Sequence, residues 1–354
     1  MIFFVIVLHV SMTYMLDVPS WWYVVSEEKN SVFLTIVNIL DVFMMPVLFF
    51  ISGYFTPASF LKKGFPAFLK DKIKHIALPW LLGIAVLIPL FPLCTGEPIE
   101  YVIDSVKANP AYLFNSQAHL WYLGVLFIFL IAYAIFAYID PPKHKRTPES
   151  NKKNILLLVS LIIISAACSH FSDHYITSYD NWIYPAYIFT LKPAKIVTYI
   201  CIFILGVYAW QKNWFTKDGW MPSLTVWRIL AICSVAFIII LKLVIIPDYD
   251  LPRLESLIPV LDSFCAFTTL IYALLIGVKL QNSNLSEFMT KISTYSYGIY
   301  WIHMPIAIFY LYLINDLNIP ILIKWISGIV VTSIISFLFS KYILKKVAFL
   351  KDIF

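Results

Sequence analysis

The sequence predicts an all-α polytopic membrane protein with about ten transmembrane helices and both termini in the cytoplasm. Of its 354 residues, 61% are hydrophobic and 13% are charged, whereas soluble domains carry about 45–50% apolar and about 25% charged residues. Apolar segments recur along the whole chain, and the loops between them alternate between many and few basic residues. We therefore expect a multi-pass protein of the cell (inner, cytoplasmic) membrane that forms one domain over residues 1–354.

Each predicted span is a run of mostly apolar residues, because a helix needs roughly 17–25 of them to cross the hydrocarbon core. Helices are expected because no water is present there to satisfy an open backbone. The first span is several residues short, and the fifth and sixth are marginal. The predicted spans are 1–16, 33–55, 76–93, 119–139, 154–170, 195–211, 228–247, 257–279, 295–314 and 319–340.

The basic residues orient these spans. The loops after the even-numbered spans, together with the C-terminal tail, hold 19 of the 26 lysines and arginines. Loops rich in lysine and arginine are cytoplasmic, so both termini are placed inside the cell. The net charge of +6 mostly reflects this asymmetry, and no nucleic-acid partner is expected. The five cysteines show no CxxC spacing, so neither a disulfide nor a metal site is expected.

The opposite loops are rich in aromatic and acidic residues, as in WWYVVSEEKN, HYITSYDNWIYPAY and PDYDLPRLE. Tryptophan and tyrosine gather at the membrane interface of many membrane proteins. Sugar rings also pack on aromatic faces and hydrogen-bond to carboxylates. The residues alone leave both interpretations open.

Four ionisable residues lie inside predicted spans, namely His9, Asp41, Asp262 and His303. Such groups cost several kcal/mol in a bilayer and are therefore functional candidates. Histidine can act as a base near neutral pH, but a buried histidine can also serve only to bond two helices. Taken alone, His9 and Asp41 fit either role, and Asp262 and His303 are expected to be structural.

Several short stretches, in their order along the chain, resemble the integral-membrane acyltransferase-3 family, and in particular its glucan-biosynthesis-C-like branch. The resemblance covers the first four spans and the last two, whereas residues 150–290 match only in hydropathy. It implies a membrane O-acyltransferase that uses acyl-CoA, first of all acetyl-CoA, as co-substrate without a bound cofactor. The implied acceptor is a cell-surface or periplasmic carbohydrate. The stretches are VLHVSMTY (7–14), FFISGYF (49–55), FLKDKIKHIALPW (68–80), AHLWYLGVLFIF (118–129) and SYGIYWIHMPI (296–306).

The first span departs from the pattern of the family, which is an arginine, ten residues and a histidine. Eleven helical residues turn through about 1,100° and rise about 16 Å, so the two side chains would share one face. His9 matches the histidine, but the arginine would fall two positions before Met1. We expect either a missing N-terminal segment, which would also explain the short first span, or a divergent or inactive member.

The resemblance implies roles for individual residues. His9 would be the catalytic base, either directly on the acceptor or through a covalent acyl relay, and Asp41, one helix away, would orient its imidazole and stabilise the cation. Basic residues after the second span would bind the phosphates of coenzyme A, although lysine lacks the bidentate fork of arginine; a plain cytoplasmic basic loop is the alternative. The donor-binding candidates are Lys72, Lys74 and His75, and those lining the acceptor side or the bundle are His119, Trp121, Tyr300 and His303.

Two other classes of protein share this composition. A transporter or exporter without acyl-transfer chemistry would also carry ionisable groups in its spans, but it would show broken helices or repeats, and neither is clear in this sequence. A membrane sensor with an inert fold is the other possibility. Binding of labelled acetyl-CoA would separate the enzyme from both.

Overall fold

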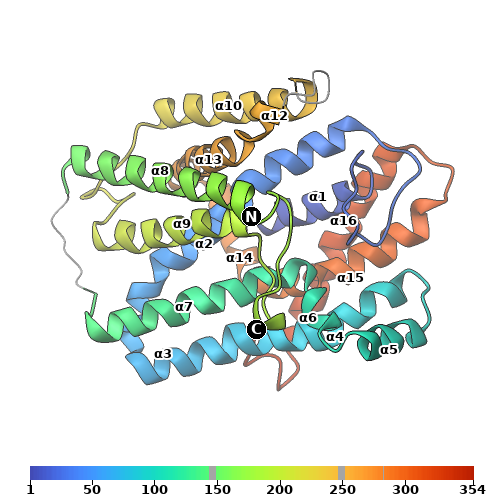
Figure 1. The fold of residues 1–354 in the computed structure, drawn as a ribbon. Helices are drawn as coiled ribbons and strands as arrows, with labels where there is room; N and C mark the ends of the chain where they lie inside the picture. The colour runs from blue at the N-terminus through green and yellow to red at the C-terminus, as the bar shows by residue number, and fades with distance from the viewer. Residues whose placement is uncertain (143–148, 246–251, 282) are drawn as a thin grey trace.

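The computed structural model describes residues 1–142, 149–245, 252–281 and 283–354. The described residues form helices and no named strand; the only β-bridge among them joins Ile183 to Leu191. The longer helices lie side by side in one bundle (Figure 1). The helices are α1 (Ile2–Met12), α2 (Ser31–Lys63), α3 (Phe65–Lys72), α4 (Leu78–Cys94), α5 (Ile99–Ala108), α6 (Tyr112–Asn115), α7 (Trp121–Ile139), α8 (Asn151–Tyr175), α9 (Pro193–Gln211), α10 (Leu224–Ile240), α12 (Pro252–Glu255), α13 (Ile258–Leu280), α14 (Asn284–Ser293), α15 (Ser296–Asn315) and α16 (Ile321–Phe339).

Each predicted span coincides with one long helix or with the short α1, although the end of the seventh, residues 246–247, lies outside the described residues. Within the described residues, eight helical segments are long and apolar enough to cross a membrane, and α1 is a shorter apolar helix. The first of the eight, Ser31–Cys94, has 64 residues and contains both α2 and α4. The protein is therefore a multi-pass membrane protein, as predicted. The additional helices α3, α5, α6, α12 and α14 lie outside the predicted spans.

Local sequence signals explain several helix ends. The Asn30 side chain accepts a hydrogen bond from the backbone N–H of Val32 at 2.9 Å and caps α2, which satisfies a donor that has no partner inside the helix. The same helix ends at Gly64, whose φ of 71° lies in the region that favours glycine. The chain then turns into α3.

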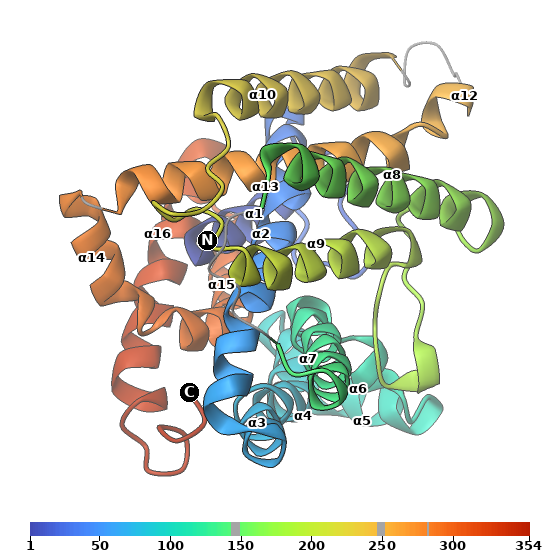
Figure 2. The ribbon, with the colours of Figure 1, turned by 90° about the vertical axis from the view of Figure 1, so that its left-hand side faces the viewer.

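Helix α2 packs closely against α9 near the middle of the bundle (Figure 2). A Cβ atom on Gly53 would collide with the backbone carbonyl of Phe203, and one on Gly206 would collide with the carbonyl of Phe50. Small residues allow two membrane helices to approach to backbone contact. These two glycines therefore set the distance between α2 and α9, and α10 lies farther out, at the edge of the bundle.

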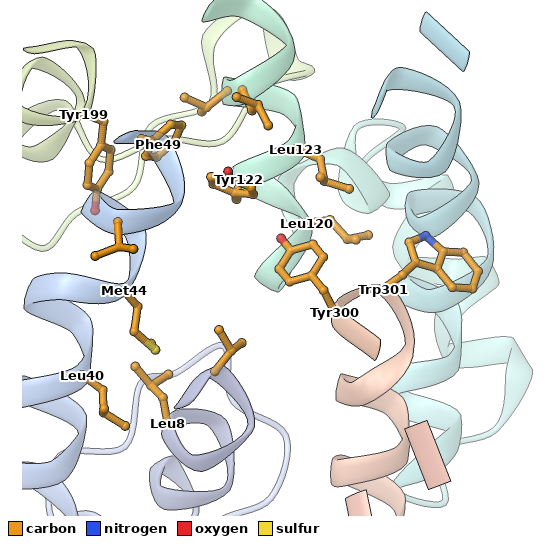
Figure 3. Close-up of a cluster of buried hydrophobic side chains, with 14 of the residues drawn as sticks. Leu8, Leu40, Met44, Phe49, Leu120, Tyr122, Leu123, Tyr199, Tyr300 and Trp301 are labelled. Atoms are coloured by element: carbon orange, nitrogen blue, oxygen red, sulfur yellow. The ribbon is translucent and has the colours of Figure 1, made fainter. Parts of the chain in front are cut away.

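Aromatic side chains fill the space between α2, α7 and α9. The ring of Phe49 lies 4.8 Å from that of Tyr122 and 4.9 Å from that of Tyr199. Figure 3 shows this group on one side and Tyr300 with Trp301 of α15 on the other. In the described part of the chain, most buried apolar side chains thus belong to one core, and Val42, Ile238 and Cys265 form a small second cluster.

Candidate active site

Three histidines from distant parts of the sequence meet in the bundle. His9 lies on α1, His119 lies in the 3-10 turn Ala118–Leu120 before α7, and His303 lies on α15. Their exposed fractions are 7%, 5% and 0%. The ring of His303 lies 5.1 Å from that of His9 and 4.9 Å from that of His119, and the rings of His9 and His119 are 6.4 Å apart. We call these residues the histidine cluster.

Backbone carbonyls fix the tautomer of each ring, because a carbonyl oxygen can only accept a hydrogen bond. Nδ1 of His9 lies 2.9 Å from the carbonyl of Val5, and Nδ1 of His303 lies 2.7 Å from the carbonyl of Tyr300. Both rings are therefore protonated at Nδ1 when neutral, and their lone pairs are on Nε2. Nε2 of His303 lies 3.2 Å from Nδ1 of His9. It is therefore a second acceptor for the Nδ1–H of His9, beside the Val5 carbonyl, and helps to hold the His9 ring.

His119 has the opposite tautomer. Its Nε2 lies 3.1 Å from the carbonyl of Trp301, so Nε2 carries the proton and donates it. Its own carbonyl accepts the hydroxyl proton of Tyr300. Nδ1 of His119 is buried without a hydrogen-bond partner.

The stretch SYGIYWIH on α15 holds the other sequence motifs together. Tyr300 and Trp301 bind the HLWYL turn at His119, as described above. Trp301 also donates its indole N–H to the carbonyl of Pro79 at 2.9 Å, and Tyr297 donates its hydroxyl to the carbonyl of His75 at 2.8 Å. Helix α15 thus joins the basic stretch FLKDKIKHIALPW (68–80), which we call the basic run, to the histidine cluster.

The loop between α1 and α2 covers the histidine cluster. The Trp22 ring stacks on His9 at 5.9 Å with an interplanar angle of 18°. Its indole N–H donates to the hydroxyl of Thr13 at 2.9 Å, and Tyr23 packs on Phe91 at 5.4 Å. No sequence motif singled out Trp22; its position in an aromatic outer loop was the available signal.

The structure does not bring Asp41 to His9. The Asp41 carboxylate lies 2.5 Å from the Lys195 ammonium, which is also 3.8 Å from Asp262. Lys242 lies 3.5 Å from Asp262, and the Tyr179 hydroxyl donates to the same carboxylate. We call these five residues the ion cluster. It borders a cavity of about 20 Å³, which is about enough for one water molecule.

Helix geometry explains this separation. Ile36, Ile39 and Leu40 of α2 line an apolar groove together with Phe4 and Val7 of α1. Asp41 follows Leu40 by one residue, a turn of about 100° around the helix, and therefore points toward α9 and α13. The contact predicted between Asp41 and the imidazole is instead made by the Val5 carbonyl and His303, and a catalytic role of Asp41 stays a prediction. This ion cluster could not be predicted from the sequence, because Lys195 stands at the start of a predicted span, where a basic residue is common.

The basic run lies where α3 meets α4. Residues Ile73–Ala77 form a π-helical turn, a feature that often occurs at functional sites. Asp71 accepts contacts from Lys63 at 2.7 Å, Lys72 at 3.2 Å and His75 at 3.1 Å. Lys74 is exposed. The structure thus gathers the donor-binding candidates Lys72 and His75 around one carboxylate, away from the histidine cluster.

Trp121 faces a different part of the bundle from His119. Its ring stacks with Tyr199 at 5.8 Å and meets Trp182 of the loop after α8 at 5.6 Å. That loop is tied to the mouth of α7, because Gln117 donates to the carbonyl of Ile188 at 2.5 Å. Trp121 therefore anchors the loop after α8, while Tyr300 and His303 pack with His119.

The fold and the site define a multi-pass membrane protein with a buried histidine cluster connected to a basic segment. The acyltransferase-3 family, described as an acyltransferase domain, matches residues 1–341. The chain belongs to this family, which confirms the resemblance of its motifs.

Two curated relatives are both called glucans biosynthesis protein C. The protein from Salmonella gallinarum (strain 287/91 / NCTC 13346) is 29% identical over 208 residues, which are 54% of this chain and 49% of the relative. The protein from Salmonella paratyphi B (strain ATCC BAA-1250 / SPB7) is 28% identical over 207 residues, with the same shares. The chain thus spans about half the length of the curated relatives it matches. No solved structure matches the chain significantly.

Proposed function

We propose that this protein moves an acyl group, most simply acetyl, from cytoplasmic acyl-CoA to a hydroxyl of a carbohydrate at the outer face of the cell membrane. The observation that carries this proposal is the histidine cluster, in which the Val5 carbonyl and His303 fix the His9 ring with a lone pair on Nε2. A sugar hydroxyl becomes a good nucleophile when a positioned base takes its proton. Membership of the acyltransferase-3 family supports the reaction class.

The proposed topology has ten crossings with both termini inside. The segment Ser31–Cys94 crosses twice in this arrangement, once as α2 and once as α4, and α1 adds one further crossing. The basic run between α2 and α4 then faces the cytoplasm, where acyl-CoA is present. The loops that carry Trp22 and Trp182 face outward.

The donor is proposed to bind at the basic run. Lys63, Lys72 and His75 converge on Asp71, and the exposed Lys74 lies beside them. Phosphate oxygens attract such cations, although lysine acts as a point charge. The hydroxyl of Tyr297 at the carbonyl of His75 connects this segment to α15 and so to His303.

The acceptor is proposed to be a carbohydrate because the outer loops present aromatic rings. Tyr187 is 71% exposed, and Tyr184 is 41% exposed. The name of the curated relatives, glucans biosynthesis protein C, supports a glucan as the first acceptor to test. An aromatic face that packs on a sugar ring would hold this acceptor at the outer end of α7.

The test compares wild type, His9→Ala and His170→Ala in lipid nanodiscs with labelled acetyl-CoA and glucan oligosaccharides. His170 is a matched control, because its Nδ1 also donates to a carbonyl, that of Ser256, at 2.9 Å. We expect His9→Ala to lower transfer at least 100-fold, in line with the contribution of general bases, and His170→Ala to stay near wild type. Equal transfer by His9→Ala, or no turnover of acetyl-CoA by wild type, as for a transporter, would refute the proposal.

A further inference from the structure

The cluster contains a second imidazole nitrogen that the proposed function does not use. Nδ1 of His119 is buried and has no hydrogen-bond partner, and among the histidines that the structure describes it is the one ring nitrogen in this state. Buried polar atoms are nearly always paired, so an unpaired one calls for an explanation such as a catalytic role. The ring lies 6.4 Å from that of His9.

We propose that His119 is a second catalytic residue, a base whose Nδ1 takes the proton of the acceptor hydroxyl while that hydroxyl attacks an acyl group carried on Nε2 of His9. This inference rests on the proposed function and divides its chemistry between two residues. His9 is the nucleophile toward the donor, and His119 is the base toward the acceptor.

The need for a second base follows from the chemistry of an acylated imidazole. The lone pair of Nε2 on His9 forms the bond to the acyl carbon, so this nitrogen can no longer accept a proton. His303 is not available as a base for the acceptor, because its Nδ1 donates to Tyr300 and its Nε2 faces Nδ1 of His9 at 3.2 Å. His303 is a positioning residue, and Nδ1 of His119 is the remaining lone pair in the cluster.

The steps balance with acyl-CoA as donor. Nε2 of His9 attacks the thioester carbon, and the C–S bond breaks with its electron pair left on sulfur. This gives a thiolate and an acyl-imidazolium that keeps its Nδ1 proton. The acceptor oxygen then attacks the acyl carbon, its proton passes to Nδ1 of His119, and the C–N pair returns to Nε2. His119 releases its proton to solvent, and the thiolate takes one up, so thioester and alcohol become ester and thiol.

The surroundings of His119 hold its ring in place for this task. Nε2 donates to the carbonyl of Trp301 at 3.1 Å, and the carbonyl of His119 accepts the Tyr300 hydroxyl. The preceding Ala118 has a φ of 46°, a left-handed conformation that side chains other than glycine rarely adopt. Strain of this kind is found mostly at functional sites. The backbone thus fixes the direction of Nδ1 at a local cost.

The decisive variant is His119→Gln, whose amide can keep the donation to the Trp301 carbonyl while it removes the base. Rapid acid quenching measures acetyl on the peptide that contains His9, and a coupled assay measures the first-turnover release of coenzyme A. We expect His119→Gln to release coenzyme A in the first turnover, to accumulate acetyl-His9 and to transfer acetyl to glucan oligosaccharides at least 100-fold more slowly. His170→Gln serves as the control and should behave as wild type.

The outcomes separate this inference from the proposed function. Transfer by His119→Gln within threefold of wild type would overturn the role of His119, and so would loss of its first-turnover release. Wild type without acceptor must also accumulate acetyl-His9. If it does not, the inference fails even if His119→Gln cannot be produced. If transfer survives in His9→Ala, both roles assigned to the cluster have failed; if wild type transfers no acetyl at all, the proposed function itself has failed.

Discussion

The contact between α2 and α9 provides a sharp test of the fold. A Cβ atom on Gly206 would overlap the carbonyl of Phe50 and lie 2.9 Å from the backbone nitrogen of Tyr54. Backbone atoms cannot turn away as a flexible side chain can, so Gly206→Ala must push the two helices apart. Overpacking in a core costs about 1–3 kcal/mol. Because the obstacle is backbone, we expect a loss of about 3 kcal/mol in the free energy of unfolding.

Gly277 is the matched control, because a Cβ atom there meets no heavy atom within 4 Å. Gly277→Ala on α13 should leave stability unchanged or raise it by up to about 1 kcal/mol, the difference in helix propensity. Denaturant titration of both variants in the same detergent measures the two changes. If Gly206→Ala and Gly277→Ala agree within about 1 kcal/mol, the close approach of α2 and α9 is not as described.

Three further predictions concern charged and polar contacts. Lys195→Met should destabilise the protein by less than the roughly 3–5 kcal/mol lost when a fully buried ion pair is broken, because the Asp41 side chain is 46% exposed and the buried Asp262 keeps Lys242; adding Asp41→Asn should recover part of the loss, measured by denaturant titration. Tyr297→Phe should weaken acyl-CoA binding, with little change in kcat, because it frees the carbonyl of His75 in the π-helical turn; steady-state kinetics measure both, and an unchanged KM would contradict the coupling. Hydrogen bonds from Lys153 and Lys212 lower the pKa of Glu149 from 4.5 to about 2. The resulting stability is therefore complete above pH 4.5 and is lost as pH falls toward 2, and thermal unfolding of Glu149→Gln should lack this dependence.

The membrane helices could be predicted because hydropathy and the distribution of basic residues act over whole segments. Each predicted span matches a helix, although the bounds differ by a few residues. The helices α3, α5, α6, α12 and α14 were missed. They are short, and their helicity depends on packing at the ends of the bundle rather than on a long apolar run.

The histidine cluster was only partly predictable. The family resemblance pointed to His9, His119 and His303 separately, but 294 positions separate the first from the last, and one sequence contains no signal for that contact. Asp41 shows the opposite case, a contact that was predicted from the sequence but is not made in the structure. Its position one helix away suggested a dyad with His9, but the direction of its side chain depends on how α2 is rotated, and that rotation is set by packing against α9 and α13.

The Trp22 loop and His9 belong to the same short part of the chain. The indole N–H of Trp22 donates a hydrogen bond to Thr13, and the Trp22 ring lies over the imidazole of His9, a residue that is 7% exposed. In the proposed mechanism, an acyl group held on that ring would therefore be shielded from solvent. A sugar that displaces the loop would bring its hydroxyl in as the indole leaves, so the same tryptophan would limit wasteful hydrolysis and make access depend on the acceptor.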